Sequence, residues 1–100
     1  MTHAQLYESC IITLEGSLAM ERGAYYNGDE FSTEADKITQ YIIKNRCDMR
    51  AVQKTSKDGT FTGWIVQFEA SGIWMGCMVF SDRVDAGEWI EHQRKQMSEI

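Results

Sequence analysis

The stretch from Thr60 to Phe80 constrains the fold of this chain more than any other. It holds two runs rich in β-branched and aromatic residues around the short link Ala70-Ser71-Gly72, which is typical of an antiparallel hairpin. Strict alternation places apolar residues on both faces of each run. In the first run, Trp64, Val66 and Phe68 share one face, and Phe61 and Ile65 share the other. In the second run, one face holds Ile73, Met75, Cys77 and Val79, and the other holds Trp74, Met78 and Phe80. A sheet with one wet face would alternate apolar and polar residues. Both faces of this hairpin therefore require cover from the chain's helices, a second copy or a partner.

The remaining sequence predicts helices on either side of the sheet. Apolar residues at helical spacing predict a first helix from His3 to Arg22, with Met1 and Thr2 frayed ahead of it. The polar stretch Gly23–Ser32 contains Asn-Gly and predicts a loop. The elements expected after it are a second helix capped by Ser32 or Thr33 and ending near Arg46, a strand Met49–Thr55 followed by the turn signal Asp58-Gly59, and a last helix Val84–Met97 capped by Ser81-Asp82.

In this order the elements predict an α+β fold: a three-stranded antiparallel β-meander with two N-terminal helices and one C-terminal helix packed on it. A chain of 100 residues with 43% hydrophobic residues is large enough for its own core, which excludes a disordered protein. We expect a single domain over residues 1–100 because no linker or repeat interrupts the pattern.

The net charge of −5 argues against a broad basic surface for phosphate groups. An acidic balance suits solubility or docking onto a basic protein surface. No apolar run approaches the length of a membrane span, and the N-terminus lacks the pattern of a signal peptide. From the sequence we expect a cytoplasmic protein that does not enter the membrane.

Acidic and aromatic residues gather from the predicted loop Gly23–Ser32 into the first turn of the second predicted helix. Tyrosine offers a large contact area at low entropic cost, so aromatic residues interleaved with acids on a loop are typical of a protein-binding epitope. Phe31 is the exception, because it is expected to pack onto the first helix. The binding residues predicted here are Tyr25, Tyr26, Asp29, Glu30, Glu34 and Asp36.

The three tryptophans divide between core and surface. Trp89 and one strand tryptophan are expected to pack in the core, as most tryptophans do. With both hairpin faces apolar, the other strand tryptophan is left on a surface. Trp74, beside Met75 and Met78, is therefore predicted to be a binding hot spot.

No constellation of residues predicts catalysis, a metal site or a cofactor. The cysteines Cys10, Cys47 and Cys77 show no paired spacing and are expected to be free thiols. Cys47 is the one expected to be exposed, where Arg46 would favour its thiolate. His3 and His92 lie far apart in the sequence, and Glu88 with His92, one helical turn apart, is an ordinary surface pair or an acid–base pair.

Residues 47–98 have the order β-β-β-α, and several of them resemble a known family. The strand residues Gly63-Trp64 and the pair Ala86 and Trp89 after Phe80-Ser81-Asp82 resemble the strand-to-helix junction of the arm-binding domains of tyrosine recombinases. With the preceding helix, the order is also similar to that of double-stranded-RNA-binding domains. The resemblance implies a nucleic-acid-binding module that would use Arg50, Lys54, Lys57 and Arg83.

Size, charge and the absence of a catalytic constellation favour a different function. The leading prediction is a non-enzymatic inhibitor that occludes a basic, nucleic-acid-handling partner such as a ribonucleoprotein. In size and charge the chain is similar to small acidic inhibitors made by phages and mobile elements, including anti-CRISPR proteins. The alternatives are the β-β-β-α nucleic-acid-binding module and a homodimer formed through the sheet.

Overall fold

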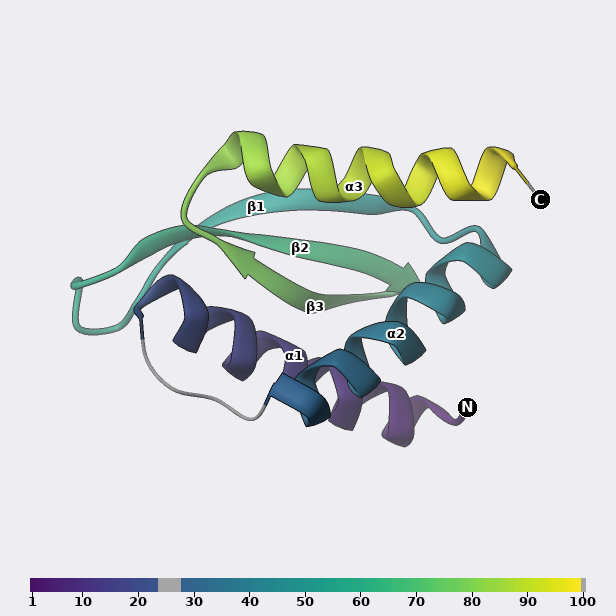
Figure 1. Cartoon of the computed structure of the whole chain (residues 1–100), viewed down its shortest axis with the longest axis horizontal. Coiled ribbons are helices and arrows are strands. Elements are labelled where there is room, and N and C mark those ends of the chain that lie inside the picture. The colour runs from purple at the N-terminus through teal and green to yellow at the C-terminus, as the bar shows by residue number, and fades with distance from the viewer. Residues whose placement is uncertain (24–27, 100) are drawn as a thin grey trace.

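The computed structural model describes residues 1–23 and 28–99, and it confirms the α+β class and the three-stranded antiparallel sheet. The sheet has the order β1-β2-β3, and Figure 1 shows α3 along one side of it and α1 beside β3. The elements are α1 (His3–Glu21), α2 (Gly28–Asn45), β1 (Met49–Thr55), β2 (Thr62–Ala70), β3 (Ile73–Phe80) and α3 (Arg83–Ser98).

The start of α1 is a formed cap, so the prediction that Thr2 frays is wrong. Gln5 N–H donates to Thr2 Oγ1 at 3.2 Å, and Thr2 N–H donates to Gln5 Oε1 at 2.9 Å. This reciprocal pair is a capping box, which satisfies amide groups that a helix start leaves without partners. At the other end Gly23 adopts a φ of +72°, the left-handed conformation expected of a glycine after a helix.

The second helix begins at Gly28, so the predicted loop over Gly23–Ser32 extends too far. Asp29 and Glu30 lie in the first helical turn, where negative charge interacts favourably with the helix dipole. Thr33 is inside the helix, where its hydroxyl donates to Asp29 O at 2.9 Å. The predicted loop was too long because it included Asp29 and Glu30, which follow the Asn-Gly turn signal in the sequence but belong to the start of the helix. The predicted packing of Phe31 onto α1 is confirmed, because its ring lies against Gly16.

The three strands form a meander whose register assigns each residue to a face. Met49 pairs with Phe68, which pairs with Met75, and these three residues are buried. We call this side the core face. The residues between them, including Arg50, Val52, Ile65, Gln67 and Trp74, lie on the opposite side, which we call the open face.

A β-bulge in β3 overturns the predicted alternation of that strand. Val66 pairs with Met78 but Gln67 pairs with Gly76, so Cys77 has no partner of its own. The extra residue keeps Met78 and Phe80 on the core face with Met75 and moves Val79 to the open face, opposite Ile65. The alternation predicted for the first run is confirmed, since Trp64, Val66 and Phe68 share the core face.

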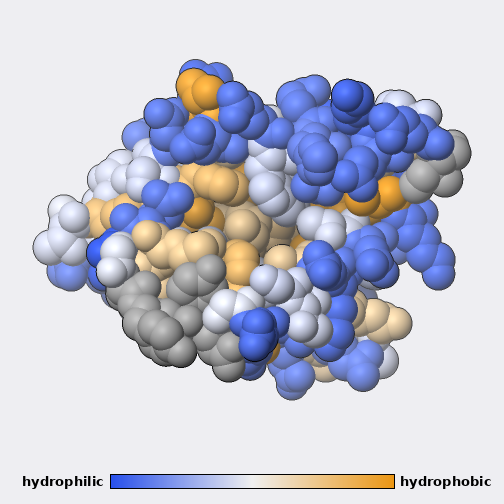
Figure 2. Space-filling view, viewed as in Figure 1, coloured by the Kyte–Doolittle hydropathy of each residue, from blue (hydrophilic) through white to orange (hydrophobic). Residues whose placement is uncertain are grey.

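The helices cover the core face and one edge of the sheet. Ala86 and Ile90 of α3 and Ile38 and Ile42 of α2 are buried in one cluster with the core-face side chains. Figure 2 shows the result from outside: the outer surface of α3 is hydrophilic except for one apolar patch at its start, and apolar side chains lie in the band between α3 and the two N-terminal helices.

The α1 helix protects the free edge of β3. The buried Ser17 hydroxyl accepts a hydrogen bond from Val79 N–H at 2.9 Å and donates to Thr13 O at 2.6 Å. An edge strand with unpaired amide groups is a site for unwanted pairing, and a helix laid against it removes that hazard. The sheet therefore has a covered edge at β3 and a covered core face, whereas β1 forms the other edge.

Gly16→Ala is expected to lower the free energy of unfolding by about 1–3 kcal/mol, although alanine is the better helix former. The added Cβ would lie 2.5 Å from Phe31 Cδ2. In a Phe31→Ala background this obstacle is gone, and the same substitution should instead raise the free energy by about 1 kcal/mol. Urea unfolding of the four proteins measures both effects, and a gain in the wild-type background would contradict the packing.

Candidate functional site

The open face carries a stack built from one residue of each strand. Arg50 Nε donates to Gln67 Oε1 at 2.7 Å, and the Arg50 guanidinium lies 4.1 Å from the centroid of the Trp74 ring. The side chain of Arg50 thus reaches across Gln67, its register partner on β2, to Trp74 on β3. A cation at this distance from an indole is attracted to the ring. The stack therefore fixes Trp74 as part of a polar–aromatic surface.

This arrangement corrects the predicted surroundings of Trp74. Met75 and Met78 are only 8% exposed and lie on the core face, so they do not border the indole. Trp74 is half-buried under Arg50. Trp74 nevertheless lies on the open face, so the prediction that one strand tryptophan lies outside the core is confirmed. Trp64 and Trp89 both pack against the core cluster, as expected.

An apolar cleft lies farther along the open face, toward the turn between β1 and β2. It has a volume of about 310 Å³. Its lining combines apolar residues of α1 and the sheet with the end of β1 and the turn: Leu18, Phe61, Gly63, Ile65 and Val79, with Lys54, Thr55, Ser56 and Lys57. The cleft was not predicted from the sequence. The β-bulge that turns Val79 toward it cannot be recognised from the pattern of apolar residues in β3.

The turn beside the cleft is held by Asp58. Its Oδ1 accepts hydrogen bonds from Ser56 Oγ at 2.6 Å, Thr60 Oγ1 at 2.7 Å and Thr60 N at 3.1 Å. The Ser56 and Thr60 hydroxyls and the Thr60 amide lower the pKa of this carboxyl group below its usual value. Gly59 adopts the left-handed φ of +71° that the turn requires. The turn therefore presents Lys57 and Phe61 in a defined position.

A stripe of α1 continues this apolar surface along β3. Leu14 lies against Gly76, and Leu18 lines the cleft with Val79, so α1 runs parallel to β3. One and two turns earlier on the same side are Ile11, 37% exposed, and Tyr7, 59% exposed. The apolar residues of α1 are thus divided between two sides, since Leu6 and Cys10 are buried in the core while Tyr7 and Ile11 are exposed.

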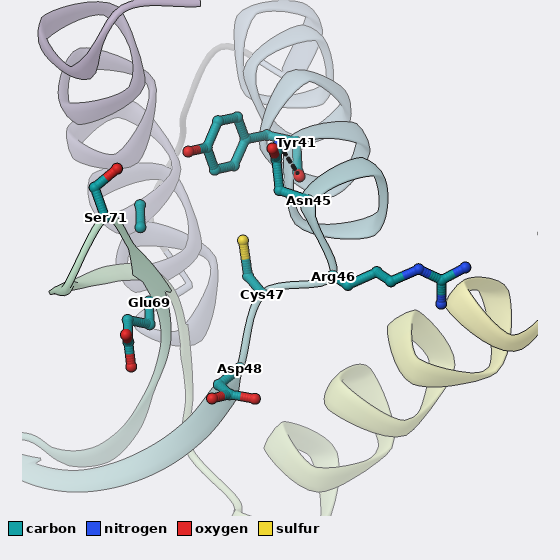
Figure 3. A pocket seen from close by; sticks show the side chains of 8 residues that line it. Tyr41, Asn45, Arg46, Cys47, Asp48, Glu69 and Ser71 are labelled. Atoms are coloured by element: carbon teal, nitrogen blue, oxygen red, sulfur yellow. Dashed lines mark hydrogen bonds between the residues drawn. The ribbon is translucent and has the colours of Figure 1, made fainter.

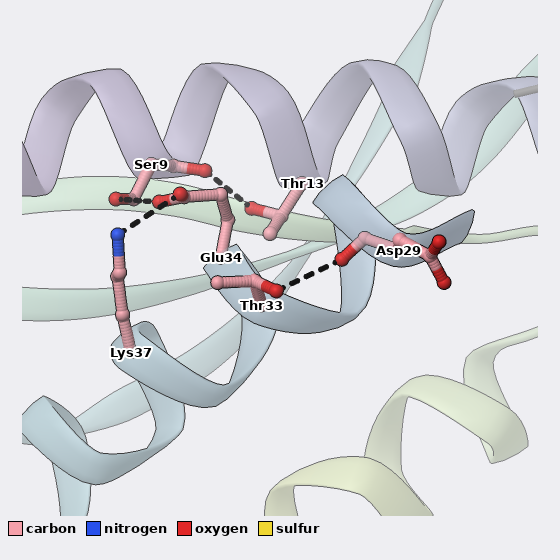
Figure 4. A network of polar contacts seen from close by, with 6 residues as sticks. All are labelled: Ser9, Thr13, Asp29, Thr33, Glu34 and Lys37. Atoms are coloured by element: carbon pink, nitrogen blue, oxygen red, sulfur yellow. Dashed lines mark hydrogen bonds and ion pairs between the residues drawn. The ribbon is translucent and has the colours of Figure 1, made fainter. Parts of the chain in front are cut away.

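The predicted acidic epitope is only partly available for a partner. Figure 4 shows Glu34 turned toward α1, where Ser9 Oγ donates to it and Lys37 Nζ lies 3.1 Å away. Its side chain is 16% exposed. Asp29, Glu30 and Asp36 are exposed on α2, whereas Tyr25 and Tyr26 lie outside the described residues. The hydrogen bond from Ser9, followed by that from Lys37, lowers the pKa of Glu34.

The predicted site residues therefore do not form one surface. Tyr41 of α2 packs against Phe68 of the core face, with ring centroids 6.1 Å apart. The acids belong to this helix, whereas Trp74 lies on the other side of the sheet. A partner that contacts Asp29 and Asp36 would not touch Trp74 through the same flat interface.

Glu34→Gln is expected to lower the free energy of unfolding at pH 7 by about 0.5–1.5 kcal/mol, because Ser9 and Lys37 lose an ionised acceptor. A lowered pKa in the folded state gives stability that is present above the ordinary value of 4.5 and lost below it. The difference from wild type should therefore shrink as the pH falls below about 4.5. Urea titrations across this range test it. Asp36→Asn is the matched control, and an equal pH response there would contradict this role of Glu34.

The four cations of the predicted nucleic-acid-binding module do not converge. Arg50 and Lys54 lie on the open face, and Lys57 lies in the adjoining turn. Arg83 lies at the start of α3, 5.6 Å from the centroid of Trp64 on the core face. Three of the four cations therefore lie on or beside the open face, which also carries the acidic residue Glu69.

A second cleft contains Cys47 and differs from the environment expected for a reactive thiol. Figure 3 shows the Cys47 sulfur directed toward Tyr41 and the Arg46 side chain directed away, toward α3. Arg46 Nη1 donates to Met97 O at 3.2 Å. Burial, then the negative charges of Asp48 and Glu69, raises the pKa of the Cys47 thiol. The expectation that Arg46 favours the thiolate is wrong.

Within residues 1–23 and 28–99, no three His, Cys, Asp or Glu side chains form a group that could hold a metal ion. His92 Nε2 lies 2.8 Å from Gln96 Nε2, so the interaction of its ring is with Gln96. None of the described helices is long and apolar enough to cross a membrane. No family model, curated protein or solved structure matches the chain.

Proposed function

We propose that this chain is a non-enzymatic protein-binding module that contacts its partner through the open face and the adjoining stripe of α1. The observation that supports it most is that apolar side chains occupy both faces of the sheet, while the described helices cover the core face and reach the open face only along β3. Val52, Ile65 and Trp74 are half-buried on the open face, and Tyr7 and Ile11 extend it. Apolar surface of this kind in a polar surround is typical of an interaction site.

The distribution of charge over the rest of the chain favours the open face as the binding surface. The helices α1, α2 and α3 hold three, four and three acidic residues against none, two and three basic residues. They therefore account for the whole net charge of −5. An interface core is normally depleted of charged residues and enriched in aromatic residues and arginine. The open face, with its stack of Arg50 on Trp74, fits that composition better than the outer sides of the helices.

The open face is tested by two neighbouring substitutions on β1. Val52→Glu places a carboxylate on the open face, whereas Gln53→Glu places the same charge on the exposed end of the core face, in register with Trp64. Affinity capture from a lysate of the source organism, after nuclease treatment, should recover a partner with wild type and with Gln53→Glu. Val52→Glu should weaken binding by at least about tenfold, because a carboxylate would replace an apolar side chain and be desolvated at the interface.

Equal recovery by the two variants would contradict the open face as the binding surface. Recovery that is lost after nuclease treatment would favour the nucleic-acid-binding module instead. Circular dichroism and thermal unfolding of both variants check that each is folded before binding is compared.

The occlusion of a basic, nucleic-acid-handling protein is a second candidate function. It is supported by the concentration of the net negative charge on the helices and by the exposed Asp29, Glu30 and Asp36. Such an inhibitor, similar to anti-CRISPR proteins in size and charge, would bind by electrostatic complementarity.

The double variant Asp29→Lys and Asp36→Lys separates the two candidates. If the helices contact a basic partner, reversal of both charges should reduce the association rate by roughly tenfold at low salt and by less at high salt. Under the open-face proposal the captured partner should bind this variant as it binds wild type. Surface plasmon resonance at two salt concentrations makes the measurement, and a salt-dependent loss would favour occlusion.

A further inference from the structure

The cleft on the open face combines an apolar floor with unpaired cations at its rim. Leu18, Ile65 and Val79 form the floor, and Lys54 and Lys57 lie at the side where β1 enters the turn. Among residues 1–23 and 28–99, the ion pairs are Lys37 with Glu34 and Arg94 with Glu91. Neither Lys54 nor Lys57 therefore has a carboxylate partner in this part of the chain. Both side chains are exposed and free to meet an external anion.

We propose that this cleft receives a bulky apolar side chain from an acidic protein segment, whose carboxylates meet Lys54 and Lys57. This inference rests on the proposed function and names the chemistry of the partner. A volume of about 310 Å³ lies at the small end of ligand pockets, which suits one or two side chains of a peptide. The apolar group would gain affinity by burial, and the flanking acids would select the partner.

Charge decides against a second copy of this chain as the occupant. Two open faces brought together would place the three cations Arg50, Lys54 and Lys57 on each side of the interface, against Glu69 as the acid that each face offers. Such like-charge contacts at an interface are costly. Cations at an exposed sheet edge also discourage self-association. An acidic segment meets the opposite charge at the same positions.

The open face is also a poor platform for nucleic acid. Arg50 already covers one side of the Trp74 ring, which a nucleobase would need for stacking. Arg83, the remaining cation of the predicted module, contacts Trp64 on the core face and is therefore absent from the open face. The net charge of −5 opposes the binding of a polyanion as long as a nucleic acid. A short acidic segment needs only the two lysines and the cleft.

Selection of a random peptide display library against the folded protein tests the inference. Wild type should enrich peptides in which acidic residues flank a bulky apolar one. The double variant Lys54→Glu and Lys57→Glu should lose these peptides and favour basic ones. An enriched peptide should bind this variant at least roughly tenfold more weakly than wild type, because two ion pairs become like-charge contacts.

The matched control reverses Lys44 and Lys95, two exposed lysines on α2 and α3, and thus changes the net charge equally. It should bind the enriched peptide as wild type does. Nuclear magnetic resonance spectra with the peptide should show shifts for the methyl groups of Leu18, Ile65 and Val79. Enrichment without acidic bias, equal loss in the control, or shifts confined to other surfaces would overturn the inference.

The outcomes separate this inference from the function on which it rests. If Val52→Glu abolishes partner capture while the selected peptides show no acidic bias, the open face binds protein by another chemistry and only the cleft assignment fails. Tight binding of a fluorescent oligouridylate that Lys54→Glu and Lys57→Glu abolish would overturn both. Sedimentation of wild type as a dimer that Val52→Glu disrupts would assign the face to a second copy and overturn the acidic-segment inference.

Discussion

The structure depends on a mismatch between a sheet with two apolar faces and helices that cover one of them but reach the other only along β3. The meander places Phe68, Val66 and Met75 toward α2 and α3, where the core forms. It leaves Ile65 and Val52 on the other side with Trp74, where α1 reaches only as far as β3. A three-stranded sheet needs an apolar face packed against helices to be stable. The core face already meets this requirement for stability. We therefore assign the apolar residues of the open face to binding.

The position of α1 connects stability to this surface. Small buried residues, including Ser9, Thr13 and Gly16, let α1 pack closely, and Ser17 binds the edge of β3 through Val79. The same register turns Leu14 and Leu18 toward the open face. One helix thus closes an edge that would otherwise pair with other strands, and it supplies one wall of the cleft.

The elements could be predicted from the sequence because their signals are local, whereas the site depended on register. Helical spacing, the Asp58-Gly59 turn and the alternation in β2 were sufficient for the fold class. The bulge at Cys77 was not predictable, since an apolar residue there fits either face, and it altered which β3 side chains lie on the open face. The stack of Arg50 on Trp74 joins residues that are adjacent only through β2. The predicted acids are on α2, but Glu34 is held by Ser9, a contact between helices that no short pattern encodes.

Site-specific photocrosslinking would test the central claim most directly. A benzophenone amino acid would replace Lys54 on the open face or, in a second protein, the neighbouring Gln53 on the other face of β1. Both positions are exposed, so their reactivity toward solvent is matched. In cells of the source organism we expect a covalent adduct with another protein from position 54 and none from position 53. An adduct from position 53 alone, or the same adducts from both, would contradict the assignment of the open face.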